Sequence, residues 1–245
     1  MKNLLVLVFL SGWALFGHAQ DQNTGISGPK NVVKFLPVNL PFNSVSFEFE
    51  RMISAKNSIT IGIGLPQQKS IMDKYGMDET DFTTAKFGTM HIRAAYRHYT
   101  GDKQLPGGFY IEPYLKYQNI KADGDYTGTI DVTEEPYKGR IEVNANTINL
   151  GFQMGTQFLI AKTVSLDIYF LGLEAGLLSG NSHGVTDKLP GANKLKNNFD
   201  KNIADLPSFI GDKFTTTQNG NIVDSEASGI LYPWLRCGIS IGIAF

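Results

Sequence analysis

The chain has 245 residues, a formal net charge of −1 at pH 7 and a single cysteine, Cys237. One cysteine excludes an intramolecular disulfide framework, and the near-neutral charge, with no basic block, argues against a nucleic-acid partner. Beyond the N-terminus no segment is continuously apolar over the ~18 residues of a helical membrane span. The 26 glycines and 11% aromatic residues leave a soluble β-sandwich or barrel, or a membrane barrel.

The first residues have the pattern of a signal peptide. Lys2 supplies the positive charge, residues 4–16 form the apolar stretch, and Gly17 and Ala19 place small residues before a cut ahead of Gln20. A transmembrane anchor is the alternative, but the stretch is shorter than the ~20 residues that a bilayer requires. We therefore expect a signal peptide over residues 1–19, cleaved near Ala19, and a short N-terminal segment over residues 20–30. No cysteine follows the cut, which argues against a lipoprotein.

The later segments that are expected to be ordered nearly all alternate between apolar and small or polar residues. Ile59, Ile61 and Ile63, for example, alternate with Thr60 and Gly62. This period places one row of side chains on each face of a β-strand. Seven segments show it: residues 45–50, 58–65, 90–97, 109–118, 148–158, 164–170 and 231–245. A first strand around residues 31–40 brings the expected number to eight.

The connections between these segments fall into two length classes. Residues 54–57, 100–108 and 161–163 are short turns. Residues 67–86, 120–138 and 178–228 are long, and short and long connections alternate from the second strand onward. A membrane barrel shows this alternation, with short periplasmic turns and long external loops. An even strand count also returns both termini to the periplasm.

The orientation of the two faces distinguishes a soluble from a membrane barrel, because only the membrane barrel turns its apolar row outward. The other row is rich in glycine, which suits a crowded interior: Gly62, Gly64, Gly151, Gly155, Gly238 and Gly242. It also carries four charges of each sign, which could pair across a narrow lumen. We predict this lumen charge network from Glu48, Glu50, Glu112 and Asp167 with Arg93, Arg97, Lys116 and Arg236.

Aromatic residues gather beside the short turns, where a membrane barrel has an interfacial girdle. We expect this girdle to consist of Tyr96, Tyr99, Phe109, Tyr110 and Phe158.

The chain ends inside its last alternating strand on Phe245, an arrangement similar to the assembly signal of bacterial outer-membrane proteins. Residues 32–36 (VVKFL), 45–51 (VSFEFER), 206–211 (LPSFIG) and 235–242 (LRCGISIG) resemble a Bacteroidota outer-membrane barrel family of unknown function. The resemblance covers most of the chain beyond the signal and implies a fold and a compartment. Its motifs are structural, so it implies no reaction.

Candidate catalytic and metal-binding residues are few. His183 directly follows Ser182, and adjacent side chains point apart, so they do not make a nucleophile–base pair. His91 is expected to fill the lumen near Arg93, and His98 ends a strand. The acidic run of Asp78, Glu79 and Asp81 lacks the glycine and closing glutamate of a calcium loop, so we interpret it as a solvated loop.

The long loop 178–228 contains one helical pattern. Leu195, Phe199, Ile203 and Leu206 recur at spacings of four, four and three, which predicts a short helix near residues 193–206 that ends at Pro207. The helix could cover the barrel mouth or form a recognition surface, and the first interpretation is favoured.

The sequence therefore predicts an all-β fold: an eight-stranded up-and-down antiparallel transmembrane β-barrel over residues 31–245, with long extracellular loops, in the cell outer membrane. The expected role is non-enzymatic, structural or surface-binding, with no cofactor. The expected partners are outer-membrane lipid, the barrel assembly machinery through the last strand, and an unknown extracellular ligand. A lipid-modifying enzyme and a narrow, low-conductance pore are the alternatives; eight strands leave an interior that side chains fill.

Overall fold

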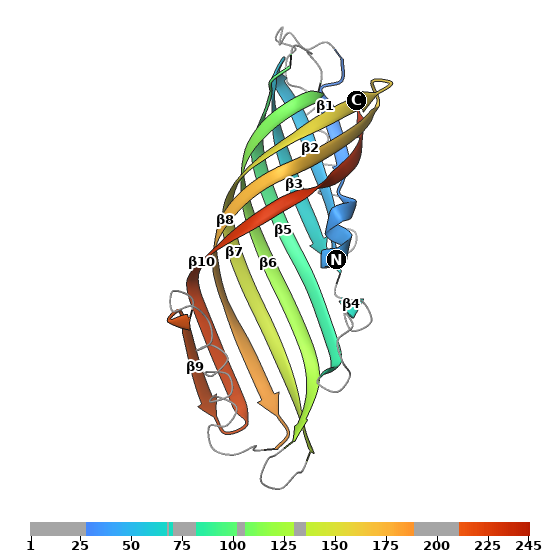
Figure 1. Cartoon of the computed structure of the whole chain (residues 1–245). Coiled ribbons are helices and arrows are strands. Elements are labelled where there is room, and N and C mark those ends of the chain that lie inside the picture. The colour runs from blue at the N-terminus through green and yellow to red at the C-terminus, as the bar shows by residue number, and fades with distance from the viewer. Residues whose placement is uncertain (1–27, 68, 71–81, 102–105, 130–135, 189–210) are drawn as a thin grey trace, which may run out of the picture.

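The computed structural model describes residues 28–67, 69–70, 82–101, 106–129, 136–188 and 211–245, and these residues are almost entirely β-strand (Figure 1). The elements in chain order are β1 (Asn31–Phe35), the 3₁₀ helix η1 (Pro37–Phe42), β2 (Ser44–Ser54), β3 (Asn57–Pro66), β4 (Lys69–Ser70), β5 (Phe82–Tyr99), β6 (Gly108–Thr129), β7 (Pro136–Ile160), β8 (Val164–Thr186), β9 (Phe214–Asn219) and β10 (Ile222–Ala244). Within these ranges no helix is long and apolar enough to cross a membrane.

Eight of the strands in the described ranges form a closed antiparallel ring. Neighbouring strands pair in the order β1, β2, β3, β5, β6, β7, β8 and β10, and β1 pairs β10 to complete the circuit. The first and last strands of the ring make this closure, since the N–H groups of Lys30 and Asn31 both donate to the Phe245 carbonyl oxygen. The prediction of eight alternating antiparallel strands is confirmed.

The strands are staggered around the ring. The pairing that starts at Ile63 on β3 passes through Ile92, Tyr117, Ile148 and Leu177, in that order, and reaches β10 at Leu231. In the other direction it passes through Phe47 and Phe35 and reaches β10 at Ile241. The circuit therefore closes with a stagger of ten residues, and a staggered ring of this kind tilts its strands by about 40°.

The first strand is shorter than predicted. We expected a strand over residues 31–40, but β1 ends at Phe35 and η1 follows. Pro37 lies in the first turn of η1 and Pro41 lies within it; both lack the N–H that a strand ladder requires. Asn43 then takes a left-handed conformation (φ 49°) that starts β2.

The long loops predicted over residues 120–138 and 178–228 are wrong over much of their length. Instead, β6 runs on to Thr129, β7 begins at Pro136, β8 runs on to Thr186, and β9 and β10 begin at Phe214 and Ile222. Likewise β5 begins at Phe82, inside the predicted loop 67–86. These stretches also alternate, but their outward residues are polar, so they lack the outward apolar row that identified the other strands.

The extra lengths form a projecting sheet, here called the extension: residues 82–88, 119–129, 136–146, 179–186, 214–219 and 222–227. Figure 1 shows β5 to β10 running on past the level of η1, whereas β2 and β3 end near it. The short turns at residues 55–56 and 161–163 and the C-terminus lie at the opposite end of the ring.

Several predictions fall outside the described residues and stay predictions. They are the signal peptide over residues 1–19, the acidic run at residues 78–81 and the helix near residues 193–206.

Candidate functional site

The ring has an outer surface that is apolar and an interior that is polar. Large apolar side chains point outward on every strand of the ring and are strongly exposed, led by Leu235 (71%) and Leu150 (69%). The alternate positions are buried and carry charged or hydroxyl groups, such as Arg97 (1%) and Glu112 (0%). This distribution is the reverse of a water-soluble protein, where charged residues are almost never fully buried unless they are paired.

Lys34 on β1 is the centre of the buried charges. Its Nζ lies 2.7 Å from Glu50 Oε2, 2.9 Å from Asp167 Oδ2 and 3.4 Å from Glu48 Oε1, and it also donates to Gln157 Oε1 at 2.7 Å. These partners come from β2, β7 and β8, so one ammonium group on β1 connects the neighbouring strand β2 with two strands that lie beyond β10 in the ring.

Two arginines on β5 complete this group. Arg93 donates to Glu48 and Glu112, and Arg97 donates through Nε to Glu112. Arg97 Nη1 also lies 2.9 Å from Asp167 Oδ2. We call these seven residues the inner cluster: Lys34, Glu48, Glu50, Arg93, Arg97, Glu112 and Asp167. Burial of so many charges is tolerated only because each has opposite charges and hydrogen bonds around it.

Two tyrosines that we expected in the interfacial girdle face the interior instead. Tyr99 and Tyr110 are fully buried (0% exposed), and their hydroxyls donate to Glu50 at 2.6 Å and Asp167 at 2.8 Å. The Arg97 guanidinium lies 3.7 Å from the Tyr110 ring centroid, a cation–π contact. For these two residues the girdle prediction is wrong, because they stand on the inward row and can satisfy carboxylates. Tyr96, Phe109 and Phe158 do point outward and are 40–48% exposed.

A second group of polar residues, the second cluster, lies on the extension side of the inner cluster. It consists of Lys116, Glu174, Arg236, Tyr114 and Tyr169. Lys116 Nζ lies 2.6 Å from Glu174 Oε1, and Tyr114 donates to Glu174 Oε2 at 2.8 Å. The Arg236 guanidinium lies over the rings of Tyr169 (4.8 Å) and Tyr114 (5.7 Å).

The eight charges predicted from the sequence thus all stand on the inward rows, and seven of them form ion pairs. Arg236 has no carboxylate within ion-pair distance among the described residues. Two charges were missed, Lys34 and Glu174. Both stand on the inward row of an alternating segment, next to Val33 and Phe35 and to Leu173 and Ala175 respectively, so extending the alternation by a few residues would have found them.

Inward glycines make room for these aromatic rings. A Cβ at Gly151 would collide with the Tyr114 ring, one at Gly155 with the Tyr110 ring, and one at Gly64 with the His91 ring. Aromatic residues that cover a glycine on the neighbouring strand help to fix register. His91 accordingly faces the interior, packed on Gly64.

The apolar surface is bounded along the strands. On β7 the outward residues from Ile148 to Phe158 are apolar except for Thr156, and the outward residues Arg140, Glu142, Asn144 and Asn146 are polar. Ten residues at about 3.3 Å each, on strands tilted by about 40°, give an apolar belt about 25 Å high. At the limit of the belt nearest the extension, the Tyr117 hydroxyl donates to Asn146 Oδ1 at 2.6 Å. The apolar ring of Tyr117 thus has its polar atom at the polar edge of the belt.

The extension reverses the polarity of the ring. Its outer face carries Lys121, Arg140, Glu142, His183 and Asp224, all exposed. Its other face is mainly apolar and half-buried, with Ile120, Ile141, Val143 and Val223. A sheet with polar residues outside and apolar residues inside is the arrangement expected in water.

The outer face of the extension contains ion pairs. Arg140 Nε donates to Glu142 Oε1 at 3.0 Å, and this bond raises the pKa of Arg140. His183 Nδ1 lies 2.6 Å from Asp224 Oδ1. Among the described residues the structure gives His183 no hydrogen bond to a serine, threonine or cysteine, and no group of three metal-binding side chains converges there.

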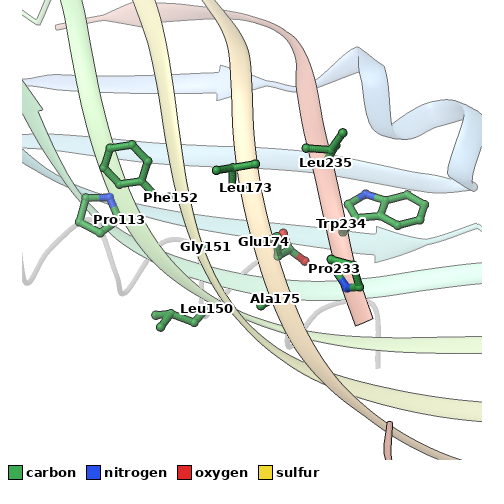
Figure 2. Close-up of a pocket in the computed structure, with 10 residues that line it drawn as sticks. All are labelled: Pro113, Leu150, Gly151, Phe152, Leu173, Glu174, Ala175, Pro233, Trp234 and Leu235. Carbon is green, nitrogen blue, oxygen red and sulfur yellow. The ribbon is translucent and has the colours of Figure 1, made fainter. Parts of the chain in front are cut away.

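A groove of about 760 Å³ crosses the outer surface of β6, β7, β8 and β10 (Figure 2). Ala175 leaves a depression among larger outward side chains, and the Trp234 indole projects from β10 at its end. The groove is lined by Pro113, Leu150, Gly151, Phe152, Leu173, Glu174, Ala175, Pro233, Trp234 and Leu235.

The sequence matches no protein-family model, and comparisons with curated proteins and with solved structures found no match either. The resemblance to a Bacteroidota outer-membrane family therefore stays a prediction, and the functional argument rests on the geometry alone.

Proposed function

We propose that this chain is a non-enzymatic β-barrel protein of the bacterial outer membrane, with a structural or surface-binding role exercised through the extension and its connections. The observation that carries the proposal is the reversed polarity of the ring, with apolar residues outside and paired charges inside. In water the exposed apolar belt would be an aggregation surface far larger than a soluble monomer carries. In lipid the same surface is the stable one, because a closed ring leaves few backbone groups without partners.

The height of the belt supports this environment. About 25 Å of apolar surface matches the outward apolar band of outer-membrane barrels. Tyr96, Phe109 and Phe158 near the short turns and Tyr117 at the limit nearest the extension suit the two interfaces, where amphipathic rings gather. The polar outer face of the extension would then stand in water on the cell surface, and the short turns would face the periplasm.

The inner cluster favours a binding or structural role over a pore. Its seven charged side chains meet across the ring within hydrogen-bond distance of one another, which leaves the interior filled at that level. An eight-stranded barrel is just wide enough to be filled by side chains. Outer-membrane lipid is the first partner in this proposal, and the barrel assembly machinery, acting on the last strand up to Phe245, is the second.

The test is migration of the membrane-fraction protein on SDS gels with and without heating, beside protease digestion of intact cells. We expect a faster band without heating and cleavage confined to the extension and its connections. A protein that is recovered from the soluble periplasmic fraction, with no shift on heating, would contradict the proposal.

A further inference from the structure

Within the described ranges, one side of β10 has no strand partner over part of the apolar belt. On the β1 side β10 is paired only over residues 241–244, and β9 pairs residues 222–227. Between them, from Ile230 to Ser240, the described residues pair β10 with β8 alone. By contrast, β6 pairs β7 along its whole length.

The short first strand causes this opening. β1 ends at Phe35, and η1 leans against β10 where a Cβ on Gly238 would lie 2.9 Å from Val38 Cγ1. From Gly238 toward Ile230 the described residues place no strand on this side of β10, because β2 and β3 also end near η1, at Ser44 and Pro66. We call this unpaired side of β10, over residues 230–238, the open seam. In hydrocarbon an edge without partners is costly, because its N–H and C=O groups have no water to bond.

Pro233 shows that the sequence accommodates an open edge at this point. Phe245 exchanges hydrogen bonds with Asn31 on the β1 side, whereas Ala244 donates to Thr163 on the β8 side. Since the two directions alternate along a strand, residue 233 would direct its N–H toward the open seam. Proline has no N–H, and proline is tolerated in sheets at edges of this kind.

The groove on the outer surface leads to this edge. It ends at Pro233, Trp234 and Leu235, and Trp234 is 55% exposed although it stands on the inward row with Arg236. An inward tryptophan that remains exposed is accounted for by the open seam beside it. Figure 2 shows the indole on the side of β10 away from Leu173 and Phe152.

Arg236 adds a charge next to the same opening. The other interior cations, Lys34, Arg93, Arg97 and Lys116, all have carboxylates within ion-pair distance. Arg236 contacts tyrosine rings, and among the described residues it has no carboxylate partner. A guanidinium at membrane depth favours an anion that can reach it.

We propose that the open seam of β10 is a lateral binding site for an anionic membrane lipid. The acyl chain lies in the groove against Pro233 and Leu235. The head group passes Trp234 into the polar interior and is bound by Arg236. The lipid is the occupant because the edge faces the belt that the proposed function places in the bilayer, and the anionic class follows from Arg236.

The experiment uses Trp234 as its own reporter. The sequence has two tryptophans, and Trp13 lies in the expected signal peptide, so the chain from Gln20 onward has Trp234 alone. This chain is refolded into phosphatidylcholine vesicles that contain either brominated phosphatidylcholine or brominated phosphatidylglycerol, with bromine at the same chain position. We expect half-maximal quenching at a roughly tenfold lower mole fraction of the anionic lipid.

Matched variants identify the residue responsible. Arg236→Gln should remove the preference and Arg236→Lys should keep most of it, while Lys121→Gln, a cation on the outer face of the extension, should change nothing. Each variant is first checked for the heat-dependent gel shift, so a misfolded sample is recognised. Equal quenching by both lipids, or a preference that Lys121→Gln abolishes and Arg236→Gln does not, would overturn the proposal.

Two further outcomes separate this inference, which rests on the proposed function, from that function. If neither lipid quenches the fluorescence, Trp234 does not lie in the bilayer, and this result would count against the outer-membrane proposal itself. Oxidative cross-linking of two copies through Cys237, which is exposed on the same strand, would show that a second copy covers the edge and would overturn the lipid site alone.

Discussion

At the residue scale, stability depends on charges that are buried in balance. Lys34 is fully buried, and three carboxylates lie within 3.4 Å of its Nζ. Replacing a complete buried ion network by apolar residues is often harmless, but removing one member leaves its partners uncompensated. Single substitutions in the inner cluster should therefore be far more damaging than substitutions of exposed ion pairs.

Lys34→Met should lower the unfolding free energy by roughly 3–5 kcal/mol, because Glu50 and Asp167 lose their shared cation in a buried site. Urea unfolding in detergent micelles, followed by the gel shift, measures this. Lys121→Met, which removes an exposed lysine from the extension, is the control and should change the midpoint little. Equal midpoints for the two variants would show that Lys34 is not central to the network.

Glu112→Ala should lower the thermal unfolding transition in detergent and leave secretion unchanged. Glu112 accepts from both Arg93 and Arg97 and also from Gln153 at 2.9 Å, so three buried donors lose an acceptor. Glu142→Ala is the control, because it removes a carboxylate whose partner Arg140 is exposed. We expect it to shift the unfolding transition by only a small fraction of the shift that Glu112→Ala causes. If the two variants melt together, the inner cluster does not stabilise the ring.

At the element scale, the junction of β1 and β10 is the most weakly paired part of the ring. Only four residue pairs join β1 to β10, and the Phe245 backbone adds bonds to Lys30 and Asn31. The pairing elsewhere is continuous over long strands, so ring closure depends on a few bonds made by the two ends of the ring. We expect these bonds to form late, because they join residues more than 200 positions apart, and contacts of such separation are slow to form.

Deletion of Phe245 should slow assembly, since Lys30 and Asn31 lose the carbonyl that closes the ring. Pulse-chase appearance of the heat-modifiable form measures the rate. Phe245→Ala retains the backbone bonds and removes the terminal ring, so it separates ring closure from an aromatic assembly signal. Wild-type rates for the deletion would refute both explanations.

At the scale of the whole molecule, one sheet passes through two environments. Along β8 the outward residues are apolar up to Leu177 and polar at Ser179, Asn181 and His183, while the inward row of the neighbouring β7 becomes apolar at Val143 and Ile141. A single strand can do this because successive side chains face opposite sides. The boundary between the two patterns is therefore a prediction of where the bilayer ends.

Cysteines placed along β8 in a Cys237→Ser background should report this boundary. A membrane-impermeant maleimide on intact cells should label Asn181→Cys and His183→Cys, and should leave Leu173→Cys and Leu177→Cys unlabelled. The reason is that a charged reagent does not enter hydrocarbon. Uniform labelling of all four positions would contradict the proposed membrane placement.

The sequence by itself determined the period of the strands, their even number and the rows that carry charge. Alternation depends only on neighbouring residues, so Glu48, Arg93 and Arg97 could be assigned to one face without a structure. It also placed Tyr99 and Tyr110 beside short turns, but it could not say which face each would take, because a tyrosine suits an interface and a buried carboxylate equally well.

The tertiary structure decided what depends on distant residues. The role of Lys34 required carboxylates from β2 and β8, more than 100 positions away in the case of Asp167. The extension was missed because its outward residues are polar and its inward residues are apolar, the reverse of the pattern by which the other strands were identified. Which face of a strand is apolar depends on the surroundings of that part of the sheet, and alternation alone does not reveal those surroundings. The open seam likewise follows from where β1 stops relative to β10, which is fixed by ring closure and stagger and leaves no local signal apart from Pro233.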